Sequence, residues 1–315
     1  MQMERHPIKL FPKMNHRKRR GGIYFLFSLP FIVFFIAFAY VPLFGWIYAF
    51  FDYQIGQRFL DPTQMVFMGV QNFIKMFIQR DEVLRVLRNT FALSGIGILC
   101  SPVPVIFAIL MNELGSRKFK RFVQTTTTLP NFISWIIVFS LIYSIFSGTG
   151  LMNSILESLG IATDPTGALG NDTHAWLVQT LIGLWKNTGW GCIIYMATIS
   201  GADAELIDAV HVDGGGRFRT IWHVILPTLI PTYLVLLLLG ISNALKNGFD
   251  QYFMFYNPLV ADKIEVLDYY VYKIGFLVND YSYSIALCMT QTVLSVLLLF
   301  FVNNLAKKTR GESLI

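Results

Sequence analysis

The sequence predicts an all-α integral membrane protein that crosses the bilayer six times. Aliphatic and aromatic residues make up 54% of the 315 residues, charged residues make up 14%, and the mean hydropathy is +0.54. Soluble domains carry more charge and less apolar surface than this. A helix needs about 20 apolar residues to cross roughly 30 Å of hydrocarbon. Six stretches qualify, namely 22–50, 88–112, 123–147, 176–200, 227–247 and 281–303.

Basic residues near the ends of these spans predict their orientation. They lie in the N-terminal tail, the 113–122 loop and the C-terminus, as Arg5, Lys9, Lys13, Arg17, Lys18, Arg19, Arg20, Arg117, Lys118, Lys120, Arg121, Lys307, Lys308 and Arg310. The 148–175 loop has no Lys or Arg and carries Glu157, Asp164 and Asp172. Because cytoplasmic loops are enriched in Lys and Arg, both termini are expected inside and the 148–175 loop outside. The net charge of +6 therefore reflects topology, and no nucleic-acid partner is expected.

The first span is expected to stay in the protein. A cleavable signal peptide has a short apolar core and a small-residue cleavage site, whereas residues 23–50 are long and contain Pro30, Pro42 and many aromatics. The expected organisation is a basic tail at 1–21, a six-span domain at 22–310 and a short tail at 311–315.

The outer segment 51–87 is predicted to contain a turn and a surface helix. Asp61-Pro62 is a turn signal, and a helical pattern follows in Phe73, Met76 and Phe77. The second span contains Pro102 and Pro104, which remove intrahelical hydrogen bonds and predict a bent helix that packs against protein.

Between the fourth and fifth spans the pattern predicts a helix, a break and a second helix. Leu206 and Val210 share one face of the first helix, and three consecutive glycines, 214–216, form the break. Each Gly in a helix interior costs roughly 0.5–1 kcal/mol relative to Ala, so the run marks a sharp turn. The second helix has its apolar residues at i, i+3, i+4 and i+7, at Phe218, Ile221, Trp222 and Ile225.

This elbow resembles the loop motif of the permease subunits of binding-protein-dependent ABC importers. The motif has Glu-Ala-Ala, three residues, Gly, nine residues, an aliphatic residue, any residue and Leu-Pro. The chain has the same spacing in Asp208-Ala209-Val210, Gly214, Val224, Ile225 and Leu226-Pro227. Asp208 replaces the usual Glu, which shortens the reach of the carboxylate but keeps its charge, and Val210 replaces the second Ala. The stretches 129–135 and 147–153 further resemble the carbohydrate branch, including permeases for aldouronates and other acidic polysaccharide fragments.

The resemblance implies a type I importer fold with the coupling loop at 201–227 on the cytoplasmic side. The residues that it assigns to coupling with the ATPase are Asp208, Ala209, Gly214, Phe218, Leu226 and Pro227. It implies as partners a second, homologous permease, two ATPase subunits, and a lipid-anchored or periplasmic solute-binding protein that delivers an oligosaccharide. The chain would supply half of the pathway in a bacterial plasma membrane. No cofactor is expected on this chain, because ATP and Mg belong to the partner subunits.

Lys186 is the one charge deep in a predicted span. It lies about ten residues inside the fourth span, on the order of 15 Å from the surface, where a lysine costs roughly 2.5–3.5 kcal/mol. It is therefore expected to face a water-filled cavity or a partner. Side chains that suit a sugar, and that we assign to the pathway with it, are Trp135, Trp185, Asn187, Trp190, Asn243, Lys246 and Asn247. Two alternatives are that Lys186 stabilises the contact with the partner permease, and that the helix ends are misplaced by a turn.

The last outer segment, 248–280, is rich in tyrosine and acidic residues. Tyrosines such as Tyr252, Tyr256 and Tyr269 offer a large contact area with a polar tip, which fits an interface with a receptor. A solvated loop with its aromatics in the headgroup region fits the same pattern.

The sequence predicts a transport subunit rather than an enzyme. It has no G-x-x-x-x-G-K-[ST] phosphate loop and no G-x-S-x-G nucleophile elbow, so no catalytic residue is assigned. The three cysteines, Cys100, Cys192 and Cys288, fall in different spans and are expected to be packing residues, and no metal site is expected. The alternative function is a stand-alone secondary transporter or channel, which would usually place several ionisable groups in its spans.

Overall fold

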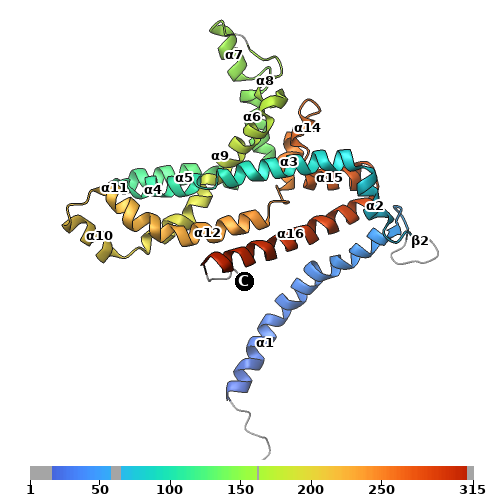
Figure 1. Ribbon diagram of the computed structural model, residues 1–315, viewed down its shortest axis with the longest axis horizontal. Helices are drawn as coiled ribbons and strands as arrows, with labels where there is room; N and C mark the ends of the chain where they lie inside the picture. Colours follow the sequence, from blue (N-terminus) through green and yellow to red (C-terminus); the bar gives the residue numbers. More distant parts are fainter. Residues whose placement is uncertain (1–15, 58–64, 162, 311–315) are drawn as a thin grey trace, which may run out of the picture.

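The computed structural model describes residues 16–57, 65–161 and 163–310 (Figure 1). The basic residues Arg5, Lys9 and Lys13, the Asp61-Pro62 turn and the tail at 311–315 lie outside this described part. The chain begins with one long helical rod made of α1 (His16–Phe35), the π-helical η1 (Ile36–Tyr40) and the 3₁₀-helical η2 (Val41–Phe50).

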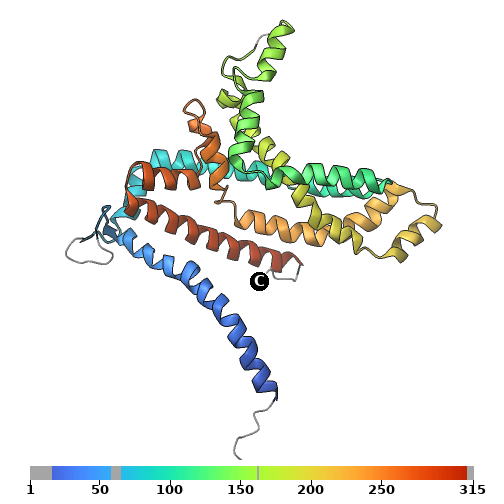
Figure 2. The ribbon, with the colours of Figure 1, turned by 180° about the vertical axis from the view of Figure 1, so that it is seen from behind.

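The body of the molecule is a bundle whose helices run along its long axis (Figures 1 and 2). It comprises α3 (Arg80–Leu99), α4 (Val103–Asn112), α5 (Arg117–Phe132), α12 (Leu226–Ser242) and α16 (Tyr281–Arg310). The interruption between α3 and α4 falls at Cys100-Ser101-Pro102, which agrees with the break predicted from Pro102 and Pro104.

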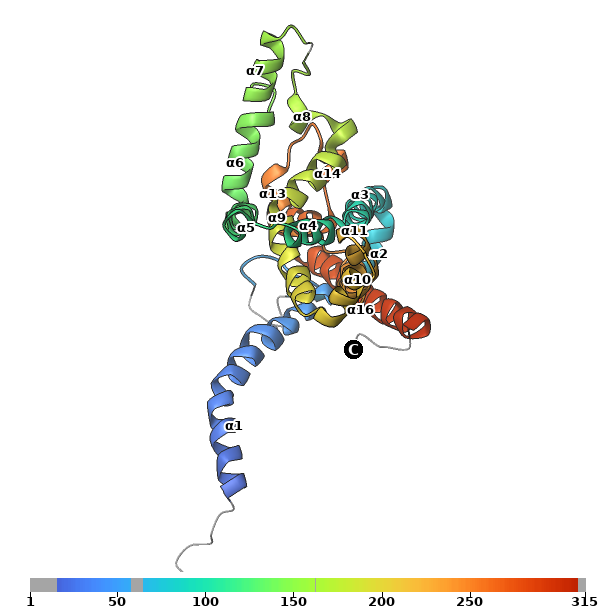
Figure 3. The ribbon, with the colours of Figure 1, turned by 90° about the vertical axis from the view of Figure 1, so that its left-hand side faces the viewer.

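A second group of helices leaves the bundle sideways. The axis of α6 (Trp135–Phe146) makes an angle of 106° with that of α5. The chain continues through α7 (Leu151–Ser158), α8 (Gly167–Gly170) and η3 (Asp172–His174) and returns in α9 (Ala175–Ser200). Figure 3 shows α6 and α7 projecting to one side of the bundle and α1 to the opposite side.

The loop after α6 is closed by tight backbone contacts. Ser147 pairs with Gly167, and a Cβ on Gly148 would lie 1.9 Å from the carbonyl oxygen of Pro165, so only glycine fits there. Hydrogen bonds from the Thr166 hydroxyl and amide and from the Asn171 amide lower the pKa of Asp164 below its usual range. These contacts give the α6–α8 segment a fixed shape.

The end of the bundle near residue 50 carries the predicted outer elements. A two-residue strand, β1 (Phe51–Asp52), pairs antiparallel with β2 (Val66–Phe67), and Phe51 lies opposite Phe67. The surface helix predicted from Phe73, Met76 and Phe77 is found as α2 (Gln71–Ile78). The 248–280 segment folds into α13 (Phe249–Phe255), α14 (Ala261–Ile264), α15 (Leu267–Tyr272) and the π-helical η5 (Lys273–Leu277).

Within the described residues, four helices are long and apolar enough to cross a membrane, or five if the bent α5–α6 pair is one span. The four are 24–50, 80–112, 217–242 and 281–304. The 26-residue helix α9 corresponds to the predicted span 176–200, but Gln179, Lys186 and Asn187 make it more polar than those four. Six crossings thus remain a prediction.

The core of the bundle lies where α9 crosses α4 and α12. Val105 and Ala108 from α4, Cys192 and Tyr195 from α9, and Leu229 from α12 are buried together there. Cys192 has the packing role expected for it, whereas Cys288 is exposed. A Cβ on Gly189 would lie 2.1 Å from the carbonyl oxygen of Thr127, so α9 contacts the backbone of α5 directly.

Candidate functional site

A cavity of about 620 Å³ lies between α3, α4, α9, α12 and the segment that follows α12. Two parts of its wall are stripes of small and polar residues. One stripe is Ser94 and Gly97 on α3 and Ser101 in the turn that follows it, at i, i+3 and i+7. The other stripe, on α9, is Gly183, Asn187 and Gly191, spaced by four. Small and polar residues at a helical period in apolar helices are the sequence signal for this cavity, and the residues on α3 were not among those predicted.

Hydrogen bonds fix the segment after α12 to the wall of the cavity. The Asn247 amide Nδ2 donates to Ser94 Oγ at 2.9 Å, and Ser94 Oγ donates to the Ala244 carbonyl at 2.5 Å. The Gln251 amide donates to the Gln179 carbonyl at 2.8 Å. The oxygen Oδ1 of Asn247 is buried and accepts no hydrogen bond from the described residues. An unsatisfied buried acceptor of this kind is costly.

The cavity brings together four of the residues assigned to the pathway. Asn187 lines it from α9, and Asn243, Lys246 and Asn247 line it from the end of α12. Three tyrosines that were not predicted also line it, Tyr195, Tyr233 and Tyr252. Among the described residues at its wall, Lys246 is the one charged side chain.

Lys186 lies elsewhere, against the break between α5 and α6. Its Nζ donates to the carbonyls of Pro130, Asn131 and Ile133 at 2.8, 3.1 and 2.6 Å, and its residue is only 5% exposed. A lysine ammonium has three donors, so all of them are used. The expected common face of Lys186 with Asn187 and Trp190 toward a water-filled cavity is therefore not formed, because Lys186 replaces the amide donors that the broken helix lacks.

The three tryptophans assigned to the pathway do not line this cavity. The Trp135 ring lies under the Lys186 ammonium, with 5.1 Å from Nζ to the ring centroid. Trp185 lines a separate apolar cavity of about 550 Å³ between α6, α8 and α9. Trp190 is half exposed and packs edge to face on Phe132 at 5.5 Å.

The predicted elbow is found at the end of the bundle opposite β1 and β2 (Figure 1). Its first arm is α10 (Ala204–Val212), and its second arm is α11 (Arg217–Thr220), which continues as the π-helical η4 (Ile221–Ile225) into α12. The Asp203 carboxylate caps α10 by accepting from the Glu205 amide at 2.9 Å.

The glycines end α10 in a Schellman motif. The Gly214 amide donates to the His211 carbonyl at 3.0 Å, and the Gly215 amide donates to the Val210 carbonyl at 2.8 Å. Gly214 has a φ of +72°, where a side chain would be strained but would meet no neighbouring atom. Close approach is instead found at Gly215, where a Cβ would lie 2.5 Å from Val210 Cγ1.

The elbow presents apolar side chains to its surroundings. No residue of α10 is buried. Of the residues assigned to coupling, Asp208, Ala209, Gly214, Phe218 and Pro227 are exposed and Leu226 is half-buried. The large apolar side chains exposed on the elbow are Leu206 (55%), Val212 (87%), Phe218 (79%) and Trp222 (61%). Such a patch on a projecting element is typical of a protein interface.

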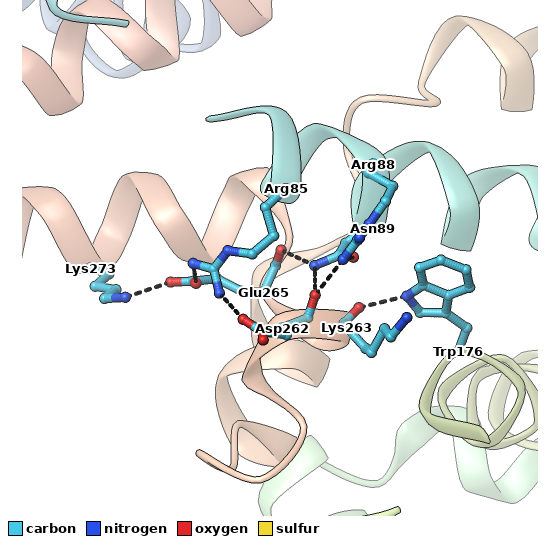
Figure 4. Close-up of polar contacts among 8 residues, drawn as sticks. All are labelled: Arg85, Arg88, Asn89, Trp176, Asp262, Lys263, Glu265 and Lys273. Carbon is cyan, nitrogen blue, oxygen red and sulfur yellow. Dashed lines mark hydrogen bonds and ion pairs between the residues drawn. The ribbon is translucent and has the colours of Figure 1, made fainter. Parts of the chain in front are cut away.

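At the opposite end of the bundle, an ion network holds the 248–280 segment to α3 (Figure 4). Glu265 is fully buried and binds Arg85 Nη2 at 2.5 Å and Lys273 Nζ at 2.8 Å, while Arg85 Nη1 binds Asp262 at 2.6 Å. The Asn89 amide donates to the Asp262 carbonyl at 2.9 Å. This network was not predicted, because Arg85 and Glu265 are 180 positions apart and no local pattern links them.

Two of the outer tyrosines pack inside the protein. Tyr252 and Tyr269 are 6% and 5% exposed and belong to a cluster with Val260 and Ile264. Tyr256 stacks on Tyr269 with 4.6 Å between the ring centroids, and burial raises the pKa of Tyr269 to about 12. In this chain these rings therefore stabilise the outer segment, which differs from the receptor interface expected for them.

Comparison with known proteins adds to this geometry. Residues 100–311 match the protein family described as binding-protein-dependent transport system inner membrane component. Protein LplB of Bacillus subtilis (strain 168) is 35% identical over 300 residues, which are 94% of this chain and 92% of LplB. The polygalacturonan/rhamnogalacturonan transport system permease protein YteP of the same organism is 34% identical over 292 residues, which are 92% of this chain and 89% of YteP.

Two solved structures have the same fold. A chain in the crystal structure of a bacterial ABC transporter involved in the import of the acidic polysaccharide alginate has a TM-score of 0.83 and 27% identity, with 94% of this chain and 98% of that chain covered. A chain of a bacterial alginate ABC transporter in complex with an alginate pentasaccharide-bound periplasmic protein also has a TM-score of 0.83 and 27% identity, with 95% and 98% covered.

Proposed function

The chain belongs to the family of binding-protein-dependent transport system inner membrane components, and we propose that it forms half of the pathway of an ATP-driven oligosaccharide importer. The observation that carries this proposal is the uncovered apolar elbow at one end of a bundle that holds a polar cavity. The elbow supplies a docking surface for an ATPase subunit. The cavity supplies hydroxyl, amide and aromatic groups of the kind that bind sugars.

The second half of the pathway comes from a homologous permease. In the described residues, α1 and the helices α6 and α7 project from the bundle and expose apolar side chains such as Phe31, Ile137 and Ile155. Lipid or a partner helix has to cover these groups. With two permeases, two elbows face two ATPase subunits. The ATPase subunits bind ATP and Mg, and this chain supplies no catalytic residue or cofactor.

The substrate is an oligosaccharide handed over by a solute-binding protein on the outer side. Two relatives support this: YteP is named for polygalacturonan and rhamnogalacturonan transport, and the alginate transporter was solved with a loaded periplasmic protein. The basic segments support a location in the plasma membrane with both termini cytoplasmic. ATP-driven closure of the ATPase pair would move the docked elbows as rigid bodies and change which side of the cavity is open.

The test is reconstitution of the chain with its partner permease, ATPase subunits and solute-binding protein in proteoliposomes. We expect uptake of labelled oligosaccharide only with ATP and the loaded binding protein, and loss of uptake when the ATPase subunits are omitted. The alternative, a stand-alone secondary transporter, predicts uptake without nucleotide along an ion gradient. The described wall of the cavity has no carboxylate to carry protons or sodium ions, which argues against that alternative.

A further inference from the structure

We propose that Lys246 is the residue of this cavity that selects acidic oligosaccharides, through an ion pair between its ammonium group and a uronate carboxylate. The inference rests on the proposed function and names the substrate class of the same site. It also moves the selecting charge away from Lys186, whose three donors are occupied by backbone carbonyls.

The first step of the argument is the charge of the groups that line the cavity. Its described lining contains hydroxyl, amide, aromatic and apolar side chains, one ammonium group and no carboxylate. A single positive charge on a wall without carboxylates attracts anions and repels cations. In a cavity whose other polar groups are neutral, an acidic sugar gains an interaction that a neutral sugar of the same shape lacks.

The second step is that the Lys246 ammonium group is not held by an ion pair or a hydrogen bond to the described residues. Three other lysines of the described part have partners: Lys75 pairs with Asp280, Lys273 with Glu265, and Lys263 lies over the Trp176 ring. Lys246 is exposed and makes neither an ion pair nor a side-chain hydrogen bond with the described residues. Its ammonium can therefore bind a ligand without breaking a contact that stabilises the fold.

The third step concerns Asp268, a carboxylate that fixes the backbone beside Lys246. Its Oδ2 accepts from the Gly248 amide at 3.0 Å, and its Oδ1 accepts from Gln291 Nε2 at 2.7 Å. The same Gln291 amide donates to the Leu245 carbonyl at 2.8 Å. Asp268 thus binds neutral donors on both oxygens and holds the segment that carries Lys246, while the lysine stays unpaired.

Other side chains of the cavity can bind the neutral groups of a sugar. Asn243, three positions before Lys246, and Asn247, which follows it directly, line the same wall of the cavity. Tyr233, which is half-buried at the wall of the cavity, offers a ring for the apolar face of a pyranose. Lysine is a compact point charge on a flexible stem, so it can follow a carboxylate as the ligand passes. A pathway needs this kind of contact, because binding must be weak enough for release.

The test uses a matched pair of substrates in the reconstituted complex: an oligogalacturonate and the same oligomer with its carboxyl groups methyl-esterified. Uptake is divided by the occupancy of the solute-binding protein, measured separately for each oligomer. For Lys246→Met we expect the acidic-to-neutral uptake ratio to fall about tenfold, the scale of a lost charge-assisted hydrogen bond, with ATPase activity kept. Lys246→Arg keeps the charge and should stay within about twofold of the unaltered protein.

Two control variants make the result specific. Asn243→Ala removes a neutral group from the same wall and should lower uptake of both oligomers alike, and Lys118→Met removes a charge far from the cavity and should leave the ratio unchanged. An unchanged ratio in Lys246→Met, or an equal loss of both oligomers, overturns the proposal. ATP-driven uptake of the neutral oligomer alone by the unaltered complex overturns it too and leaves the proposed function standing. Absence of ATP-driven uptake of either oligomer refutes the proposed function itself.

Discussion

Three backbone carbonyls at the break between α5 and α6 receive the Lys186 ammonium, and this arrangement shows how one side chain stabilises an interrupted membrane helix. The last carbonyls of a helix have no intrahelical donors, and in a bilayer no water replaces them. An ammonium in an apolar span is costly by itself. The hydrogen bonds between the Lys186 ammonium and the three carbonyls satisfy the donors and the acceptors together. The Trp135 ring adds a cation–π contact at 5.1 Å.

Lys186→Met is expected to destabilise the protein and not to alter substrate preference. Each buried carbonyl left without a donor costs about 1–3 kcal/mol, so loss of three hydrogen bonds should lower the melting temperature clearly. Thermal unfolding in detergent, followed by tryptophan fluorescence, measures this. Lys246→Met is the matched control and should melt like the unaltered protein. A Lys186→Met variant that melts normally and has lost only acidic substrate would contradict this role.

The sequence predicted that Lys186 requires a partner but not which one. Its acceptors lie 53 to 56 positions earlier in the chain. They are backbone carbonyls, which every residue has, so no residue type in the sequence identifies them. Asn243, Lys246 and Asn247 were assigned to the pathway and do share one wall of the cavity, although α12 ends at Ser242 and the three residues follow it outside the helix. Tyr195 and Tyr233 were not predicted to line the cavity, because a tyrosine in an apolar helix is often at least partly buried in the core.

At the scale of elements, the elbow was the part of the chain most fully predicted. Its two arms and its glycine break follow from apolar spacing and from the low helix propensity of glycine, and both are local properties. The bend of 106° between α5 and α6 lies inside the span predicted at 123–147, and an apolar pattern does not carry the angle of such a bend. Its angle depends on the carbonyl contacts of Lys186 and on the packing of α9, which are long-range.

The three glycines of the elbow should respond differently to substitution. Gly215→Val would place side-chain atoms on Val210 and Arg219, so the arms should open and coupling should fail. Gly214→Ala meets no atom, and its cost is the roughly 1 kcal/mol of a positive φ. Gly216→Ala has open space and a φ of −84°, which makes it the control. Receptor-stimulated ATPase activity of the reconstituted complex should follow this order, and an unaffected Gly215→Val would show that the elbow tolerates rearrangement.

At the scale of the whole molecule, the described part has three kinds of surface on one bundle. The elbow lies at one end, the outer segment held by Glu265 lies at the other, and α1 and the α6–α8 segment project sideways (Figures 1 and 3). Which of the two ends faces the cytoplasm is predicted from the basic residues alone. The sideways projections were not predicted, because the sequence of one subunit does not encode where its partner lies.

Labelling of single cysteines from one side of the membrane tests this orientation. With the native cysteines replaced, Glu157→Cys on α7 should react with an impermeant maleimide in intact cells, since the 148–175 loop has no Lys or Arg and is predicted outside. His211→Cys on α10 should react only after permeabilisation, because the elbow is predicted to lie in the cytoplasm. Both positions are exposed, so access to the reagent decides the outcome.

Lys118→Cys at the start of α5 is the matched control for this experiment. It lies in the basic 113–122 loop, which should share the cytoplasmic side with the elbow, so Lys118→Cys and His211→Cys should respond together. Labelling of His211→Cys in intact cells would place the elbow outside, where no ATP-driven partner operates, and would contradict both the topology and the proposed docking. Labelling of Lys118→Cys alone would instead mean an uneven number of crossings between the two positions, and would exclude the six-span arrangement.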